Sequence, residues 1–186
     1  MTPIDRLLQS WRLSRVRPFL RRGARVLDIG CADGVLFRRY ASLGIHGVGL
    51  DPGLDRLVED SDRAFRLLPV DACAEVPDLG QFDLVVMLAV LEHVRPDAQR
   101  VLAKRILEWL TENGRLVVTV PSVAVDRILS VLLRLRLVNG MSLDEHYGFR
   151  PESVPPLFCE AGFRLVRHRR FQLGLNNLFV FSKEAL

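Results

Sequence analysis

Two segments of the chain combine a short apolar run, an aspartate and small residues as a nucleoside-binding site requires. In VLDIGCADG, Asp28 ends an apolar run, and Gly30, Ala32 and Gly34 follow at every second position. A buried strand that stops at a turn of small residues lets backbone amides approach a ligand, and a helix is expected to begin there. In GVGLDP, Asp51 closes a second apolar run and is placed to accept hydrogen bonds from ribose hydroxyls. Together the segments indicate a nucleoside-binding α/β domain.

The spacing of the small residues argues against a dinucleotide as the ligand. A dinucleotide fingerprint has glycines at its first, third and sixth positions, whereas counting from Gly30 this chain has Ala32 and Val35 at the latter two. The branched side chain of Val35 stands where a glycine would permit close packing of helix on strand. Asp28 would also place negative charge beside a pyrophosphate. It suits a cationic ligand end, such as the ammonium group of an amino acid.

These segments resemble the first motifs of class I S-adenosylmethionine-dependent methyltransferases. The resemblance continues in order through PVDA, FDLVVMLAVLEHV and NGRLVVTVP, so that it covers about residues 22–121, with Ala32 at the usual middle glycine. It implies S-adenosylmethionine as the cofactor, with Asp51 on the ribose and Asp71 on the adenine amino group. The residues that it implies as cofactor-binding are Asp28, Gly30, Cys31, Ala32, Gly34, Asp51, Pro52, Asp71, Ala72 and Leu88.

Methyl transfer from a sulfonium is an in-line displacement, in which alignment of acceptor, methyl group and sulfur supplies much of the acceleration. A general base is needed only where the acceptor must lose a proton. The candidate catalytic residues are His93 and His146, because imidazole titrates near neutral pH. His93 follows Glu92 at the end of a predicted strand and is also open to a capping or structural role.

The LEHV stretch resembles the quinone-biosynthesis O-methyltransferases, and that resemblance implies acids and a histidine at this place as candidate metal ligands. This chain has Ala89 where that comparison expects a further acid. Glu92 and His93 alone would leave a divalent cation under-ligated, so no metal is expected.

Three functions follow from the resemblance. Favoured is methylation of a small-molecule or lipid-like acceptor. An RNA or protein methyltransferase is the second hypothesis, although Leu88-Ala89-Val90-Leu91 replaces the Asn-Pro-Pro-Tyr-type motif of base amino-group methylation. A non-catalytic cofactor-binding domain is the third.

Apolar runs and breakers predict alternating strands and helices. Strands are expected at 25–29, 46–50, 66–70, 82–88, 115–120, 163–171 and 177–182, and helices at 33–42, 53–60, 96–112 and before Gly162. Such alternation implies a parallel sheet covered by helices on both faces. The expected fold class is α/β, a Rossmann-like three-layer sandwich. Its sheet is mostly parallel and seven-stranded and ends in a C-terminal antiparallel hairpin.

One domain is expected over 1–186, with an N-terminal helix at 1–22 and a lid-like helical insertion at about 122–148. The apolar side predicted for the N-terminal helix carries Ile4, Leu7, Leu8 and Trp11, with Val16 or Leu20. In the insertion, 123–138 is apolar apart from a narrow polar stripe and Arg136. Its broad apolar face could meet protein, an apolar substrate or a membrane interface, and a lid over the acceptor is favoured.

The amino-acid composition and the first residues give an expectation for the cellular compartment of the protein. No run of eighteen or more uncharged apolar residues occurs, and the first residues lack the compact apolar core of a secretory signal. The three cysteines are widely spaced and form no CxxC pair, which favours a reducing compartment and disfavours structural zinc. A cytoplasmic location is therefore expected.

Arginines account for much of the net charge of +4 and gather near both ends of the chain. They are Arg6, Arg12, Arg15, Arg17, Arg21, Arg22 and Arg25 in one group, and Arg164, Arg167, Arg169 and Arg170 in the other. Such groups attract phosphates or an anionic membrane surface, so peripheral membrane contact stays open beside a merely solvated face. No aromatic residues are interleaved for base stacking, which disfavours nucleic acid as a partner. The oligomeric state is not predicted.

Overall fold

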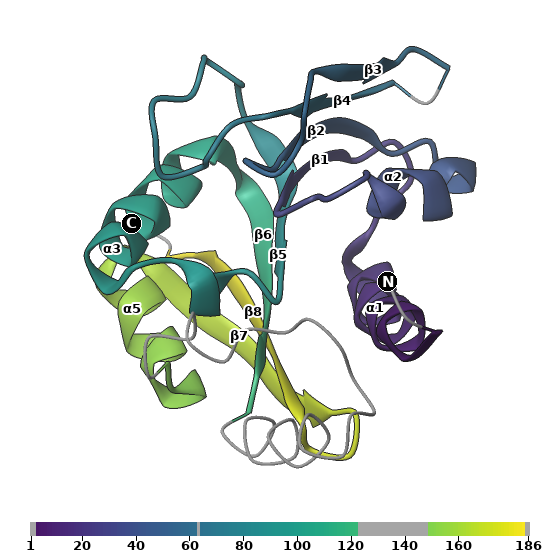
Figure 1. Ribbon diagram of the computed structural model, residues 1–186. Coiled ribbons are helices and arrows are strands. Elements are labelled where there is room, and N and C mark those ends of the chain that lie inside the picture. The colour runs from purple at the N-terminus through teal and green to yellow at the C-terminus, as the bar shows by residue number, and fades with distance from the viewer. Residues whose placement is uncertain (1–2, 63, 123–148, 185–186) are drawn as a thin grey trace.

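The computed structural model describes residues 3–62, 64–122 and 149–184, which form one eight-stranded sheet with helices on both faces (Figure 1). The strands are β1 Arg25–Ile29, β2 His46–Leu50, β3 Val58–Asp60, β4 Phe65–Leu68, β5 Phe82–Leu88, β6 Leu110–Pro121, β7 Phe163–Phe171 and β8 Asn176–Lys183. The α-helices are α1 Pro3–Val16, α2 Val35–Arg39, α3 Pro96–Trp109 and α5 Val154–Glu160. Four short 3-10 helices are described as well: η1 Arg17–Phe19, η2 Ala41–Leu43, η3 Leu91–His93 and η5 Pro151–Ser153.

The strand order is β3-β4-β2-β1-β5-β6-β8-β7. The strands from β4 to β6 in this order pair in parallel, whereas β8 is antiparallel to both β6 and β7. The predicted α/β class, the mostly parallel sheet and the C-terminal hairpin are therefore confirmed. The carboxyl ends of the parallel strands lie at one edge of the sheet, where open α/β sheets bind ligands.

The predicted count of seven strands is wrong, because the segment expected as a helix at 53–60 contains a strand. Val58–Asp60 forms β3 and pairs antiparallel with Phe65–Leu67 of β4. Leu54, Leu57 and Val58 have the i, i+3, i+4 spacing of an amphipathic helix, and a three-residue edge strand is too short to show its own alternation. Pairing with the free edge of β4 decides the structure of this segment.

Alternate residues of the central strands point to two apolar layers. On β1, Val26 packs with the cluster under α1 and α2, whereas Leu27 and Ile29 pack with the cluster under α3 and α5. Figure 1 shows these helix pairs on opposite sides of the sheet. This is the three-layer arrangement expected from the sequence.

The side on which the N-terminal helix was expected to pack is confirmed at Val16 and Leu20 and wrong at Leu7 and Trp11. Leu7 is 65% exposed and Trp11 is 37% exposed, while Leu13, Val16 and Leu20 are buried. The helix also ends at Val16 and continues as η1, short of the expected 22. Only its C-terminal half packs closely into the core, so the first apolar stripe remains at the surface.

Two other helices are shorter than predicted. The helix expected at 33–42 is α2, which ends at Arg39 before η2, and the helix expected at 96–112 is α3, which ends at Trp109. After Trp109, Leu110 pairs with Phe82 of β5 and so begins β6. The insertion helix expected at 123–138, and most of the lid, lie outside the described residues. Among the residues described, no helix has the length and apolar character needed to cross a membrane.

Candidate active site

The turn after β1 is built for close approach of backbone. Gly30, Ala32 and Gly34 all have positive φ, at +74°, +46° and +76°. A Cβ added at Gly30 would lie 2.2 Å from a methyl carbon of Val90, so the space next to the loop after β5 admits only glycine there. Ala32 takes a conformation that favours glycine although it has a side chain. The small residues seen in the sequence therefore match a real steric need.

Asp51 fastens this turn to the end of β2. Its Oδ2 accepts a hydrogen bond from the Ala32 N–H at 2.8 Å, and its Oδ1 accepts one from the Gly53 N–H at 2.8 Å. A carboxylate has about four lone-pair sites, so each oxygen keeps capacity for a further donor. Asp51 is half-buried, and its fixed position suits recognition of two neighbouring hydroxyls.

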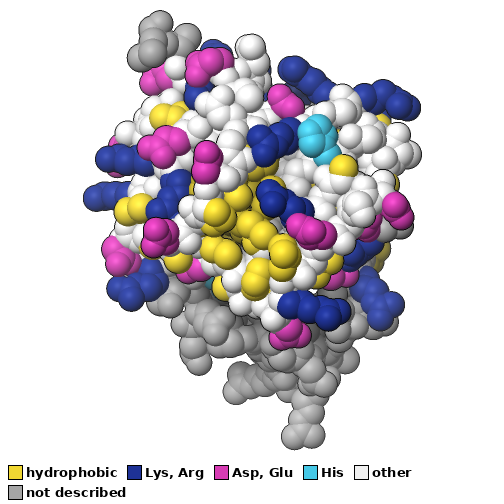
Figure 2. All heavy atoms as spheres, turned by 90° about the horizontal axis from the view of Figure 1, so that it is seen from above, with side chains coloured by type: hydrophobic (Ala, Val, Ile, Leu, Met, Phe, Trp, Pro, Cys, Tyr) yellow, Lys and Arg dark blue, Asp and Glu magenta, His cyan; other side chains and the backbone are white. Residues whose placement is uncertain are grey.

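A cavity of about 340 Å³ lies beside this turn. Its wall includes four of the predicted cofactor residues, Gly30, Pro52, Asp71 and Ala72, together with His93. Most other lining residues are apolar, with Arg95 an exception. Seen from above the view of Figure 1, hydrophobic side chains gather in a hollow surrounded by charged ones (Figure 2). A mainly apolar cavity with a few polar groups at its edge is the usual form of a small-molecule site.

A second cavity, of about 80 Å³, opens on the other side of Gly30. It is lined by the predicted residues Asp28, Gly30, Cys31, Ala32 and Leu88. The two cavities share Gly30 and together contain eight of the ten predicted cofactor residues. Asp51 lines neither cavity, but it accepts a hydrogen bond from Ala32, which lines the small one. Gly34 faces Leu67 and Phe65 in the core and also lines neither cavity.

Helix α1 supplies three residues of the small cavity that the sequence did not indicate as cofactor-binding, namely the polar Gln9 and Arg12 and the apolar Leu13. Gln9 and Arg12 line it opposite the strand residue Asp28. In the sequence, Arg12 is one of many arginines before β1, and Gln9 has no motif around it. The i, i+3 spacing puts both on one helix face, but only the packing of α1 shows which face meets the cavity.

The small cavity combines a buried acid, Asp28, with the guanidinium of Arg12. Asp28 is 5% exposed, and its burial, with a smaller contribution from Asp51, raises the pKa of its carboxyl group to about 8. A cation would favour the ionised form. Burial and the Asp28 charge raise the pKa of the Cys31 thiol as well, so Cys31 remains a neutral thiol at physiological pH.

The loop after β4 carries Asp71 and is fixed from two sides. Asp71 Oδ1 accepts a hydrogen bond from the Cys73 N–H at 2.8 Å, which closes a local turn. From α3, the Arg105 guanidinium donates to the carbonyl of Ala72 at 2.8 Å and also to the carbonyl of Ala74. The loop thus holds Asp71 at the mouth of the large cavity.

Of the two candidate catalytic histidines, the structure describes only His93. His93 lies in η3, is exposed and lines the large cavity with Asp71. His146 lies outside the described residues. No group of three or more His, Cys, Asp or Glu side chains suited to a metal occurs among the described residues.

Comparisons with known proteins show the family of the chain. Residues 4–168 match a family model described as a methyltransferase domain. The ubiquinone biosynthesis O-methyltransferase of Acinetobacter baylyi is 28% identical over 156 residues, which are 77% of this chain and 64% of that protein. The tRNA U34 carboxymethyltransferase of Photobacterium profundum is 30% identical over 119 residues, which are 58% of this chain and 36% of that protein.

Among solved structures, a TehB-like SAM-dependent methyltransferase from Corynebacterium glutamicum has a TM-score of 0.66 and 17% identity, with 97% of each chain covered. The chain spans 59% to 64% of the length of three of the curated relatives it matches. The family match covers most of the sequence, including every element that forms the two cavities. The chain therefore belongs to the class I S-adenosylmethionine-dependent methyltransferases.

Proposed function

We propose that this chain transfers a methyl group from S-adenosylmethionine to a small-molecule or lipid-like acceptor by in-line displacement. The observation that carries the proposal is the meeting of two unlike cavities at Gly30. One is large and mostly apolar with Asp71 at its edge, and the other is small and contains the buried Asp28. A nucleoside joined to a cationic amino acid fits this pair. When bound, the cofactor supplies a methyl group on a positively charged sulfur.

Each polar group of the site then has a distinct task. Asp51 accepts the ribose hydroxyls, and Asp71 accepts the adenine amino group. Asp28 takes the ammonium group, and Arg12 pairs with the carboxylate at the same end. The turn from Gly30 to Gly34 provides room for the ligand more than donors, because the N–H groups of Gly30, Cys31, Ala32 and Gly34 already donate within the protein. The support for these assignments is that the donors and acceptors line the appropriate cavity or bind its turn.

His93 is better placed to enclose the nucleoside than to accept a proton from the acceptor. It shares the wall of the large cavity with Asp71, and that cavity matches the adenosine part of the cofactor. Proton acceptance stays a prediction for His93 and His146. The two roles differ in their kinetics: His93→Asn should raise the KM for the cofactor and leave the pH profile of kcat unchanged if His93 encloses the nucleoside.

The ubiquinone biosynthesis relative supports an oxygen atom of a small, partly apolar molecule as the acceptor. The test uses the purified protein, S-adenosylmethionine with a radiolabelled methyl group, and three acceptor mixtures: prenylated catechols, total tRNA and a protein extract. We expect label in the organic extract of the catechol reaction, and none with Asp51→Ala. Label confined to protein, or no label in any mixture, would contradict the proposal.

An RNA acceptor is the second candidate, because one relative acts on tRNA U34 by its name and the chain is basic. Label that enters tRNA, resists protease and is absent with catechols would establish this candidate. The same reactions thus separate the two acceptor classes.

The Asp51 assignment gives a sharp binding prediction. Asp51→Ala removes a charged acceptor of two hydrogen bonds, each worth about 1.5–3 kcal/mol, so cofactor affinity should fall at least about tenfold. Isothermal titration with S-adenosylmethionine measures it. Asp55→Ala, which removes an exposed acid from the same loop, is the matched control and should bind normally. Equal affinities for the Asp51 variant and the control, both folded, would refute the assignment.

A further inference from the structure

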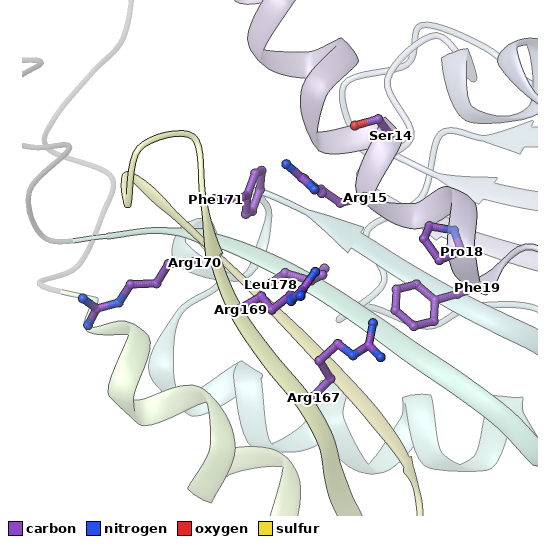
Figure 3. A pocket seen from close by; sticks show the side chains of 9 residues that line it. All are labelled: Ser14, Arg15, Pro18, Phe19, Arg167, Arg169, Arg170, Phe171 and Leu178. Carbon is purple, nitrogen blue, oxygen red and sulfur yellow. The ribbon is translucent and has the colours of Figure 1, made fainter.

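One arginine of the N-terminal group, Arg15, meets members of the C-terminal group in a separate cavity between α1 and β7. The cavity has a volume of about 140 Å³ and is distinct from both cavities of the active site. Figure 3 shows that Arg15 comes to it from the helix and that Arg167 and Arg169 come from the strand. Phe171 and Leu178 form part of its apolar floor. Arginines from the two ends of the sequence therefore lie around one hollow.

The register of the edge strand β7 places two of these arginines on one face of the sheet. Arg167 pairs with Val180 and Arg169 with Leu178, and both partners belong to the apolar layer under α1. Residues two apart on a strand share a face, so both arginines lie on the side of the sheet that α1 covers. Both are exposed, because α1 does not reach across β7.

The charges of this cavity are not neutralised within the described part of the chain. The ion pairs found there involve Arg38, Arg95 and Lys183, and none involves an arginine of the cavity. The buried Nε of Arg15 has no hydrogen-bond partner among the described residues, and its guanidinium lies 5.5 Å from the centre of the Phe171 ring. Several like charges around one hollow repel one another, so an anion in the hollow would relieve the repulsion.

The size of the hollow limits the ligand to a compact group. Cavities that enclose a whole drug-sized molecule have about 300–1,000 Å³. At about 140 Å³, this one accommodates an anionic group such as a phosphate, with the rest of the molecule outside. The rest of the ligand must therefore lie against the mixed apolar and polar protein surface around the hollow.

Exposed apolar side chains lie on both elements that form the cavity. Leu7 is 65% exposed, Trp11 is 37% exposed, and Ser14 of the same stripe lines the cavity, at i, i+4 and i+7 along α1. Leu173, in the turn between β7 and β8, is 96% exposed. Gln172 holds this turn against the helix by donating from Nε2 to the Leu8 carbonyl at 3.1 Å.

The side chain of Leu173 adds almost no packing to the fold. Its φ is +57°, in the left-handed region where glycine or asparagine is more stable, and its side chain contacts almost nothing. A large apolar side chain in such a place is available to a partner. Leucine and tryptophan beside arginines are the side chains that enter a membrane interface, with the cations at the level of the lipid phosphates.

We propose that this face, consisting of the cavity between α1 and β7 and the flanking Leu7, Trp11 and Leu173, docks on a membrane that contains anionic phospholipid. Arg15, Arg167 and Arg169 bind the lipid phosphate. The three apolar side chains enter the interfacial region. This surface lies on the helix that also lines the small cofactor cavity, so docking fixes the orientation of the active site relative to the lipid.

The test is co-sedimentation of the full chain with vesicles of phosphatidylcholine alone or with 30% phosphatidylglycerol. We expect binding to the anionic vesicles only, reduced at 0.5 M NaCl. The double variant Arg167→Glu/Arg169→Glu should bind at least about 25-fold more weakly, since each basic residue near an anionic surface contributes about fivefold. The matched control, Arg100→Glu/Lys104→Glu, reverses two exposed charges of α3 on the opposite face and should bind within about twofold of the wild type, because only long-range attraction changes.

The variant Leu173→Asn separates the contribution of the apolar side chain to vesicle binding from the contribution of the arginine charges. Asparagine tolerates positive φ, so the turn should keep its form, and circular dichroism verifies the fold. We expect weaker vesicle binding by this variant at both salt concentrations. Equal loss in the α3 control, no preference for anionic vesicles, or full binding by both the arginine and the leucine variants would overturn the proposal. So would tRNA binding that is lost in Arg167→Glu/Arg169→Glu while vesicles are not bound.

Discussion

Asp28 is buried next to a second carboxylate, and we expect its protonation to link folding to cofactor binding. Burial is the larger cause of its raised pKa, and the charge of Asp51 is the smaller one. The strand position of Asp28 can be read from the sequence, but its pKa cannot. That value depends on how completely the neighbouring strands and α1 exclude water from the carboxyl group.

The raised pKa gives a sign for the pH dependence of stability. The native carboxyl group holds its proton up to about pH 8, whereas the unfolded one loses it near 3.8. Between these values the native state binds more protons, so the free energy of unfolding should fall as pH rises, by up to about 1.4 kcal/mol per pH unit. Urea unfolding at pH 5, 6, 7 and 8 measures the slope. Asp28→Asn should flatten it, whereas Asp55→Asn should not.

Cofactor binding should show the opposite trend with pH. Below pH 8, Asp28 must release a proton before it can pair with the ligand's ammonium group, so affinity should rise by up to about tenfold per pH unit. Measurements between pH 6 and 7.5 keep that ammonium largely charged, because α-amino groups titrate near 7.7–8.0. Calorimetry in two buffers of different ionisation enthalpy detects the released proton. No proton release, with affinity independent of pH, would show that Asp28 does not meet the cation.

At the scale of elements, contacts between distant helices and loops complete the site. A strand, its turn and its closing acid form one local motif, so Gly30 and Asp51 were predictable as site candidates. Gln9 and Arg12 belong to α1, and their contribution depends on a packing face that was predicted correctly only at the C-terminal end of the helix. Arg105 belongs to α3, more than thirty residues after the loop that it holds. No periodic pattern in the sequence indicates contacts between such distant segments.

Arg105 should act as a positioning residue for Asp71. Its bonds to the Ala72 and Ala74 carbonyls fix the loop, so Arg105→Ala should weaken cofactor binding about three- to tenfold by leaving the loop to be ordered on binding. Turnover at saturating cofactor should change little. The control is Lys104→Ala, which truncates the exposed neighbour on α3. A fall in kcat with unchanged KM for the cofactor would assign Arg105 a different role.

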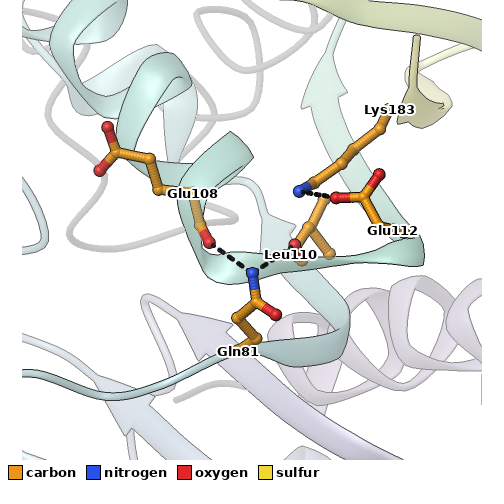
Figure 4. Close-up of polar contacts among 5 residues, drawn as sticks. All are labelled: Gln81, Glu108, Leu110, Glu112 and Lys183. Atoms are coloured by element: carbon orange, nitrogen blue, oxygen red, sulfur yellow. Dashed lines mark hydrogen bonds and ion pairs between the residues drawn. The ribbon is translucent and has the colours of Figure 1, made fainter. Parts of the chain in front are cut away.

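The end of α3 shows why element boundaries were less predictable than element types. Gln81 Nε2 donates to the carbonyls of Glu108 and Leu110, both at 3.4 Å, and Lys183 pairs with Glu112 at 2.9 Å (Figure 4). These partners come from the loop before β5 and from β8. The local sequence favours a helix up to Asn113-Gly114, but contacts with distant segments draw the chain into β6 at Leu110, five residues before the predicted start at 115.

At the scale of the whole molecule, the alternation of strands and helices was sufficient to predict the parallel sheet and the hairpin. The crossover connections of such a sheet bring the ends of β1, β2, β4 and β5 to one edge. That topology is why cofactor candidates from four sequence segments lie around two adjoining cavities. The added strand β3 lies at the far edge of the sheet, where one antiparallel partner suffices and the sequence is least constrained.

Because the site draws on so many elements, cofactor binding should stabilise the whole fold. A ligand at one hundred times its dissociation constant adds about 2.7 kcal/mol to the free energy of unfolding. For a chain of this size, this corresponds to a rise in Tm of roughly 5–10 °C. Differential scanning calorimetry with S-adenosylmethionine measures the rise. At the same ligand concentration the rise should fall to about half or less in Asp51→Ala, for an affinity loss of about tenfold or more, and persist in full in Asp55→Ala. A wild-type Tm that does not respond to saturating cofactor would mean that the two cavities do not form its binding site.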